Sequence, residues 1–194
     1  MPRRLNQVRL VDVPRTPWRN GGGSTQVLLA WPDAPHWQLR ISVAQIDHDG
    51  DFSAYPGVLR WFAVLHGAGV HLQLGASLQT LKPGSPPLQF DGATAPGCTL
   101  IDGPTQDLNL MSRPAAGRAH MQAAGQPAWH SEAGFRACFT HTAVRLQIDG
   151  EPALALPAQS LVWGMQSAGH AWALHSDQGP LQAWWMSLQT PPSR

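Results

Sequence analysis

Arginine side chains lie close to amide and hydroxyl side chains in three segments of this chain. The first is Trp18–Asn20, which precedes three glycines at 21–23; the second holds Arg40 and Ser42; the third is Asp107–Arg113. A guanidinium group can bind a carboxylate through two parallel hydrogen bonds, and amides and hydroxyls supply neutral ones. These residue types predict a binding site for a small acidic molecule.

The three consecutive glycines at 21–23 permit positive φ angles and leave backbone N–H groups accessible. A loop of this kind can form an anion-binding nest, although a flexible connection is the simpler interpretation of the glycines alone. Directly before them, Trp18 offers an aromatic wall, Arg19 a guanidinium and Asn20 an amide. This combination favours a ligand-binding loop.

Residues 37–46 alternate between apolar and other side chains with a period of two, which predicts a strand with Arg40 and Ser42 on one face. That face either is exposed to solvent or lines the interior of a barrel. In the second case an internal acid or a ligand carboxylate must pair with Arg40, because a buried unpaired guanidinium is costly.

The third segment places Asp107, Asn109, Met111 and Arg113 on one strand face, and the two intervening leucines mark the packed face. Asp107 could be the internal partner of Arg40 or Arg113, or it could form a surface ion pair of little energetic value. It is also the general base that a metal-independent enzyme would use.

Nine histidines raise the question of a metal site, and their spacing argues against one. His66 and His71 are five residues apart, as are His170 and His175, so each pair points to opposite faces of a regular strand. Nor does the chain contain the His-x-His and Glu arrangement with which metal-binding cupins gather their ligands. We therefore expect neither a metal nor another cofactor.

The remaining polar groups do not indicate nucleophilic catalysis. Cys98 and Cys138 are isolated in apolar stretches, which predicts buried reduced thiols, and no Gly-x-Ser-x-Gly motif is present. Asp47, Asp49 and Asp51 surround a glycine, which indicates a solvated hairpin turn.

The elements that position these residues are predicted to be short strands, because 19 glycines and 18 prolines interrupt the chain too often for long helices. Residues 69–92 and 144–164 share a weak pattern of strand, turn and strand. This repeat suggests two barrels, with residues 114–132 as the crossover between them. The predicted domains are 1–115 and 116–194. The clearest strand candidates are residues 25–31, 37–46, 58–65, 69–74, 99–101, 107–113, 135–140, 144–148, 161–163, 171–175 and 181–188.

The overall composition argues against some classes of binding partner. Lys and Arg total 13 against 12 Asp and Glu, a net charge of +1, so no broad positive field attracts nucleic acid or an anionic membrane surface. No stretch approaches the ~20 apolar residues of a membrane helix, and the N-terminus lacks the pattern of a secretory signal. We expect a cytoplasmic protein.

Taken in their order along the chain, the three polar segments described above resemble those of the HutD/Ves family. The supporting matches are the Leu-x-Gly-x-Gly turn at 65–69 and the Phe-x-Gly turn at 90–92, and the resemblance covers residues 16 to 113. The motifs that carry it are Trp18-Arg19-Asn20-Gly21-Gly22-Gly23, then Arg40-Ile41-Ser42 with Phe52-Ser53 and Tyr55-Pro56-Gly57, then Asp107-Leu108-Asn109-Leu110-Met111 with Arg113.

The resemblance implies an all-β bicupin fold, two cupin-like β barrels in one chain, without the usual cupin metal ligands. HutD members are associated with bacterial histidine utilisation and with a pocket suited to N-formylglutamate; Ves members are associated with stress responses. Two positions depart from the family pattern. Arg19 stands where the family usually has Lys, and Leu59 stands where an acidic residue commonly precedes Arg60.

The sequence thus predicts a non-enzymatic binding or regulatory protein for a small acidic metabolite resembling N-formylglutamate. The alternatives are a metal-independent hydrolase or isomerase acting on a related amide or acid, and a stress-response interaction scaffold, in which the adjacent Trp184 and Trp185 leave a homodimer open. The predicted ligand-binding residues are Trp18, Arg19, Asn20, Gly21, Arg40, Ser42, Ser53, Arg60, Asp107, Asn109, Met111 and Arg113.

Overall fold

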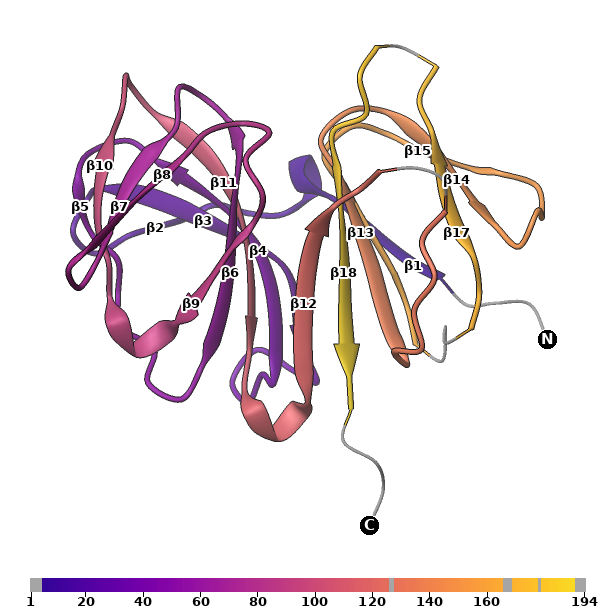
Figure 1. The fold of residues 1–194 in the computed structure, drawn as a ribbon, viewed down its shortest axis with the longest axis horizontal. Coiled ribbons are helices and arrows are strands. Elements are labelled where there is room, and N and C mark those ends of the chain that lie inside the picture. The colour runs from indigo at the N-terminus through magenta and orange to yellow at the C-terminus, as the bar shows by residue number, and fades with distance from the viewer. Residues whose placement is uncertain (1–4, 126–127, 166–168, 178, 191–194) are drawn as a thin grey trace. The chain divides into compact units, whose positions relative to one another are not determined.

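The computed structural model describes residues 5–125, 128–165, 169–177 and 179–190. The chain divides into two compact units (Figure 1). The N-terminal unit is Pro14–Ala116, and the C-terminal unit combines the chain from Gly117 onward with the segment up to Val13. Nearly all regular structure in both units is β-strand; the helices described are single 3-10 turns.

The N-terminal unit is built from two antiparallel sheets. The six-stranded sheet has the order β2-β3-β4-β11-β6-β9, and the four-stranded sheet has the order β5-β10-β7-β8. The strands of the first are Thr16–Pro17, Gly23–Trp31, Leu39–Ile46, Thr105–Ser112, Leu59–His66 and Leu88–Asp91; those of the second are Gly50–Asp51, Gly97–Leu100, Val70–Leu74 and Ser77–Leu81. The short 3-10 turns η2 and η3 are Gly92–Thr94 and Pro114–Ala116.

Apolar side chains from both sheets meet in one cluster, so the two sheets of this unit face each other. Ile46, Phe62 and Val64 come from the six-stranded sheet, and Leu72 and Cys98 from the four-stranded one. All five are nearly inaccessible to solvent. Burial of this apolar surface is the main term that holds the sheets together.

The C-terminal unit repeats the two-sheet plan. A five-stranded sheet has the order β1-β16-β13-β18-β12, and a three-stranded sheet has the order β15-β14-β17. The strands of the first are Leu5–Arg9, Ser160–Gly164, Phe135–Thr140, Ala183–Gln189 and Arg118–Ala123; those of the second are Leu154–Leu156, Val144–Ile148 and Trp172–His175. The 3-10 turn η1, Leu10–Asp12, follows β1.

Tryptophans fill the interior of the C-terminal unit. Trp129 stacks on Trp185 with ring centroids 5.0 Å apart, and Trp172 meets both rings edge-on. Trp184, on the opposite face of β18, is also buried and lies against Phe139. Both faces of β18 are therefore covered at these two positions.

Each strand predicted from the sequence overlaps an observed strand, and the structure adds β1, β2, β5, β8, β9, β12 and β15. The segment predicted as a crossover, 114–132, contains β12, which pairs with β18. The predicted first domain began at residue 1, but β1 pairs with β16 of the C-terminal unit. Cross-strand hydrogen bonds thus join residues 5–9 to residues 160–164, a pairing that no local sequence pattern reports.

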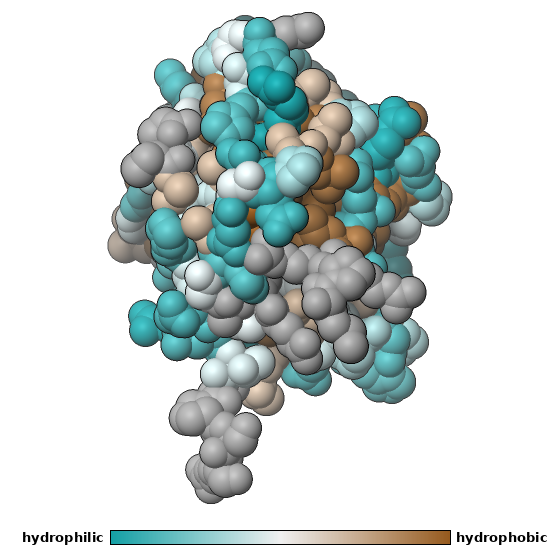
Figure 2. Space-filling view, turned by 90° about the vertical axis from the view of Figure 1, so that its right-hand side faces the viewer, coloured by the Kyte–Doolittle hydropathy of each residue, from teal (hydrophilic) through white to brown (hydrophobic). Residues whose placement is uncertain are grey.

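Hydrophilic side chains predominate on the face shown in Figure 2, with a smaller hydrophobic area among them. Leu154, on β15, is one large apolar residue that is exposed in the C-terminal unit. None of the described helices is long and apolar enough to cross a membrane.

Gly23 starts β3 at a place where a side chain does not fit. A Cβ there would lie 2.1 Å from the Gln45 carbonyl oxygen and 3.2 Å from the Trp18 ring. Gly23→Ala is expected to lower the free energy of unfolding by about 1–3 kcal/mol through overpacking. Gly50→Ala is the control, since nothing lies within 4 Å of its Cβ. Urea unfolding that gives the two variants equal stability would contradict this account of Gly23.

Candidate functional site

A cavity of about 460 Å³ opens within the N-terminal unit. Its walls come from the turn after β2, from strands β3, β4, β6 and β11, and from the segment that contains β5. The residues lining it are Thr16, Pro17, Trp18, Arg19, Asn20, Thr25, Val27, Arg40, Ser42, Ala44, Ile46, Asp51, Phe52, Ser53, Tyr55, Arg60, Phe62, Asn109 and Met111.

Strand register places the polar residues of one wall in rows. Met111 on β11 is paired with Arg40 on β4 and with Arg60 on β6. In the next row of the same face, Asn109 is paired with Ser42 and Phe62. Side chains two residues apart on a strand share a face, so both rows point into the cavity. Two arginines, an amide and a hydroxyl thus converge on one wall.

The Arg60 guanidinium is held in place by aromatic rings and one amide. Its side chain is 6% exposed, and its Nη2 donates a hydrogen bond to Asn109 Oδ1 at 3.0 Å. The rings of Phe52, Tyr55 and Phe90 have their centroids 5.0–5.7 Å from its central carbon. Cation–π contacts of this kind stabilise a cation and fix its orientation.

Electrostatics around Arg60 disfavour its charged form. Burial lowers the pKa of Arg60 to about 10; Tyr55 opposes the change, and the neighbouring Arg40 cation adds to it. The buried Nε and Nη1 atoms of Arg60 have no hydrogen-bond acceptor. Donors left unsatisfied in the interior are costly, so this group is suited to an additional anionic partner.

Arg40 lies beside Arg60 and has no carboxylate partner among the described residues. Its Nη1 is 3.7 Å from the Met111 sulfur, and its side chain is half-buried. Of the two partners that the sequence allowed for a buried Arg40, an internal acid is thus not found in the described part of the chain. The cavity residues comprise three arginines and one aspartate, a formal charge of +2.

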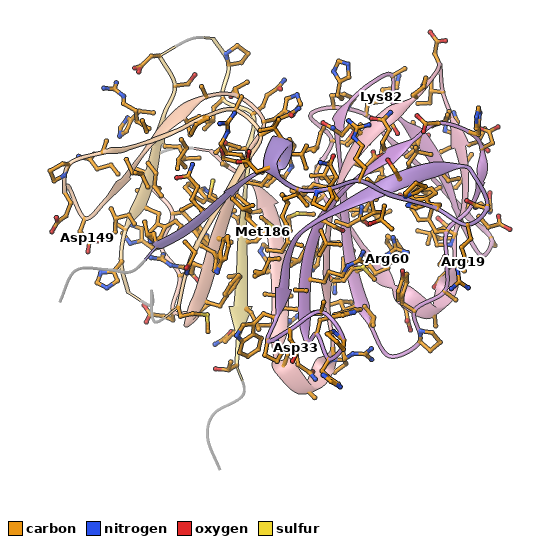
Figure 3. The ribbon with its side chains drawn as sticks, turned by 180° about the vertical axis from the view of Figure 1, so that it is seen from behind. Arg19, Asp33, Arg60, Lys82, Asp149 and Met186 are labelled. Atoms are coloured by element: carbon orange, nitrogen blue, oxygen red, sulfur yellow. The ribbon has the colours of Figure 1, made fainter. Side chains whose placement is uncertain are left out.

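Trp18, Arg19 and Asn20 line the cavity, whereas the glycines after them do not. Trp18 Nε1 donates to Thr25 Oγ1 at 2.7 Å, and the backbone N–H of Gly21 donates to the Trp18 carbonyl. The N–H of Gly22 donates to Asn20 Oδ1 at 3.0 Å. The predicted anion-binding nest is therefore wrong for these two glycines, since their N–H groups already have acceptors. Arg19 lines the cavity, whereas Gly21 does not. Figure 3 labels Arg19 and Arg60, both in the N-terminal unit.

Asp107 shares the face of Asn109 but does not line the cavity. It is fully buried, and its Oδ2 accepts a hydrogen bond from the Thr105 hydroxyl at 2.8 Å. Burial raises the pKa of Asp107 to about 8, and the hydrogen bond from Thr105 only partly opposes this. The hypotheses that Asp107 pairs with Arg40 or Arg113 are wrong, because its carboxylate is hydrogen-bonded to Thr105 and forms no ion pair with a described arginine.

Arg113 lies one residue beyond the end of β11 and outside the cavity. Its guanidinium stacks 4.9 Å from the centroid of the Trp37 ring, and its Nε donates to the Trp37 carbonyl at 3.2 Å. Strand alternation predicts side-chain direction only while the strand continues, which explains why Arg113 does not join Met111 on the cavity wall.

The structure thus gathers nine of the twelve predicted residues in the cavity and leaves out Gly21, Asp107 and Arg113. It also adds residues that were not among the predicted ligand-binding residues, notably Asp51 and Tyr55. Asp51 belongs to β5, where a solvated hairpin turn was predicted. A two-residue strand carries too little alternation to be recognised. Whether these residues bind a ligand stays a prediction.

Metal-ligating side chains do not gather at this site. In the part of the chain that the structure describes, no group of three or more His, Cys, Asp or Glu residues could hold a metal ion. Cys98 and Cys138 are both free and buried. Burial raises the pKa of the Cys98 thiol to about 12, with the nearby Asp107 and Asp49 acting in the same direction, so it is not a reactive thiolate.

Sequence comparison matches residues 10–181 to the profile of the HutD family. The chain belongs to the HutD family. An uncharacterised 21.2 kDa protein in the hutC 3′ region of Pseudomonas putida is 34% identical over 125 residues, which cover 61% of this chain and 63% of that protein. Protein Ves of Citrobacter koseri is 38% identical over 110 residues, 53% of this chain and 56% of that protein. The matches thus span less than two thirds of these relatives.

Solved structures agree with this family assignment. A conserved protein of unknown function from Pseudomonas aeruginosa PAO1 has a TM-score of 0.88 and 29% identity, covering 96% of this chain and all of that one. HutD from Pseudomonas fluorescens SBW25 has a TM-score of 0.82 and 27% identity, covering 97% and 100%. Oxalate decarboxylase from Lactobacillus farciminis shares the fold alone. It is 11% identical, with a TM-score of 0.66, and the match covers 95% of this chain and 86% of that chain. The prediction of an all-β bicupin is confirmed.

The buried Asp107 predicts a pH dependence of stability. Unfolded, it ionises near its ordinary pKa of 3.8; folded, it keeps its proton up to about pH 8. The folded state binds more protons in this window, so a stabilising contribution that is complete below pH 3.8 is lost as the pH rises to 8.

Asp107→Asn is therefore expected to gain stability relative to the wild type as the pH rises from 5 to 8. Thermal melts across this range measure the difference, with the exposed Asp47→Asn as the control that keeps the wild-type slope. Parallel curves for wild type and Asp107→Asn would show that Asp107 does not titrate in this window.

Proposed function

We propose that this HutD family member is a non-enzymatic binding or regulatory protein for a small acidic metabolite, with N-formylglutamate as the reference ligand. The family's association with histidine utilisation supports the choice of ligand. The observation that carries the proposal is the Arg60 guanidinium, which is buried in a cavity wall without a carboxylate partner among the described residues.

The energetic argument starts from the cost of burying a charge. Removing a cation from water is expensive unless an anion or several hydrogen bonds replace the solvent. Arg60 receives aromatic contacts and one amide, and Arg40 adds a second positive charge to the same row. A ligand carboxylate between Arg40 and Arg60 would neutralise part of this charge and accept hydrogen bonds from both groups.

The surrounding residues favour a ligand with a short apolar body. Val27, Ala44 and Phe62 line the cavity next to the arginines, and Trp18 closes its rim. Asn109 and Ser42 supply neutral hydrogen bonds in the same row. Most small-molecule sites have this composition, apolar walls with a few convergent polar groups.

Neither alternative function gains support from the geometry. Asp107, the general base expected for a metal-independent enzyme, does not line the cavity. Trp184 and Trp185, which motivated an interaction scaffold, are buried. A homodimer stays a prediction that light scattering can test.

Titration calorimetry with N-formyl-L-glutamate tests the proposal, together with thermal melts. At about 100 times Kd the ligand adds ~2.7 kcal/mol, which raises Tm by roughly 5–10 °C for a protein of this size. Arg40→Ala and Arg60→Met are expected to weaken binding about 10- to 100-fold, the usual value of a charged hydrogen bond.

Arg113→Ala is the matched control, because Arg113 lies outside the cavity and its loss should leave the affinity unchanged. Circular dichroism verifies that each variant folds. If Arg40→Ala and Arg60→Met both bind as the wild type does, the cavity is not the site. Formation of a product from the ligand in the presence of a chelator would instead favour the enzyme.

A further inference from the structure

Asp51 brings a negative charge into a cavity whose other charged residues are arginines. It belongs to β5, in the four-stranded sheet, whereas Arg40 and Arg60 lie on β4 and β6 of the six-stranded sheet. Because the two sheets face each other, the carboxylate and the pair of guanidinium groups come from opposite sides of the cavity.

The position of Asp51 is set by strand pairing with β10. Its register partner is Gly97, and a Cβ added to Gly97 would lie 3.3 Å from Asp51 Oδ1. The absence of a side chain at 97 thus leaves room for the carboxylate. Among the described residues, the Asp51 carboxylate forms no ion pair and no side-chain hydrogen bond, so it is available to a molecule in the cavity.

The other two aspartates of this segment have structural partners instead. Asp49 Oδ1 accepts a hydrogen bond from the backbone N–H of Leu100 at 2.8 Å. Asp47 Oδ1 accepts one from the Gln45 amide at 3.3 Å. Neither lines the cavity, so Asp51 differs from its neighbours in both its location and its lack of a partner.

We propose that Asp51 is a specificity-determining residue of this site. It accepts a hydrogen bond from an N–H group of the ligand, either an amide or an ammonium, while the ligand's carboxylate lies between Arg40 and Arg60. It also disfavours an acid that places a second carboxylate beside β5; N-formylglutamate, which has two carboxylates, would direct its formamide N–H to Asp51 and its second carboxylate away from β5. This inference rests on the proposed function and adds the chemistry of the ligand's other end.

The expected effect is moderate because Asp51 is exposed to solvent at the cavity mouth. Charges near a protein surface interact through a high effective dielectric, so gain or loss of this contact should change affinity by about three- to tenfold. The direction of the change, rather than its size, distinguishes Asp51 from a general contribution to the charge of the site.

Three five-carbon acids at pH 7 separate these effects. Pentanoate has one carboxylate and an apolar end, 5-aminopentanoate adds an ammonium, and glutarate adds a second carboxylate. Calorimetry is run with wild type, Asp51→Ala, Arg40→Ala and the control Asp47→Ala. Asp51→Ala is expected to weaken 5-aminopentanoate three- to tenfold, to strengthen glutarate by a similar factor and to leave pentanoate unchanged.

The outcomes distinguish this inference from the proposal on which it rests. If the acids bind and depend on Arg40, but Asp51→Ala changes all three affinities equally or none, Asp51 has no role in specificity and the binding function stands. Asp51 likewise has no role in specificity, and the binding function stands, if Asp47→Ala changes the three affinities in the same way as Asp51→Ala. If none of the three acids binds the wild type although N-formyl-L-glutamate does, the role of Asp51 alone is overturned; if N-formyl-L-glutamate does not bind either, the binding function is overturned with it.

Discussion

Burial of the Arg60 guanidinium is the constraint around which the N-terminal unit is organised. A cation that is 6% exposed requires compensation, and the fold supplies it from separate parts of the chain. Three aromatic rings surround the group, and Asn109 accepts one of its hydrogen bonds. None of these contacts neutralises the charge, so the unit retains a positive site that faces an open cavity.

The pairing of three strands turns this cation into part of a site. Because β11 lies between β4 and β6, the register brings Arg40, Met111 and Arg60 into one row across the sheet. A shift of one residue would point the polar row to the opposite face. The buried apolar residues on the other face of these strands, such as Ile41 and Leu110, oppose such a shift.

The C-terminal unit has the same two-sheet plan as the N-terminal unit, but aromatic rings fill its interior. Arg136 is the second residue of β13, as Arg60 is the second residue of β6, and both are buried against aromatic rings. The rings around Arg136 are Trp129 and Trp172, at 5.1 and 4.8 Å. These larger rings, together with Trp185, occupy the space between the two sheets of this unit.

Local alternation determined much of the site in advance: it placed Arg40 with Ser42, and Asn109 with Met111, on common strand faces. It could not place Arg113, which lies just past the end of β11, or reveal Asp51, whose strand has two residues and pairs with Gly97 far along the chain. Side-chain periodicity is a property of consecutive residues and is therefore visible in the sequence. Strand ends, the pairing of distant strands and the acids left unpaired depend on contacts between remote segments, so only the tertiary structure decided them.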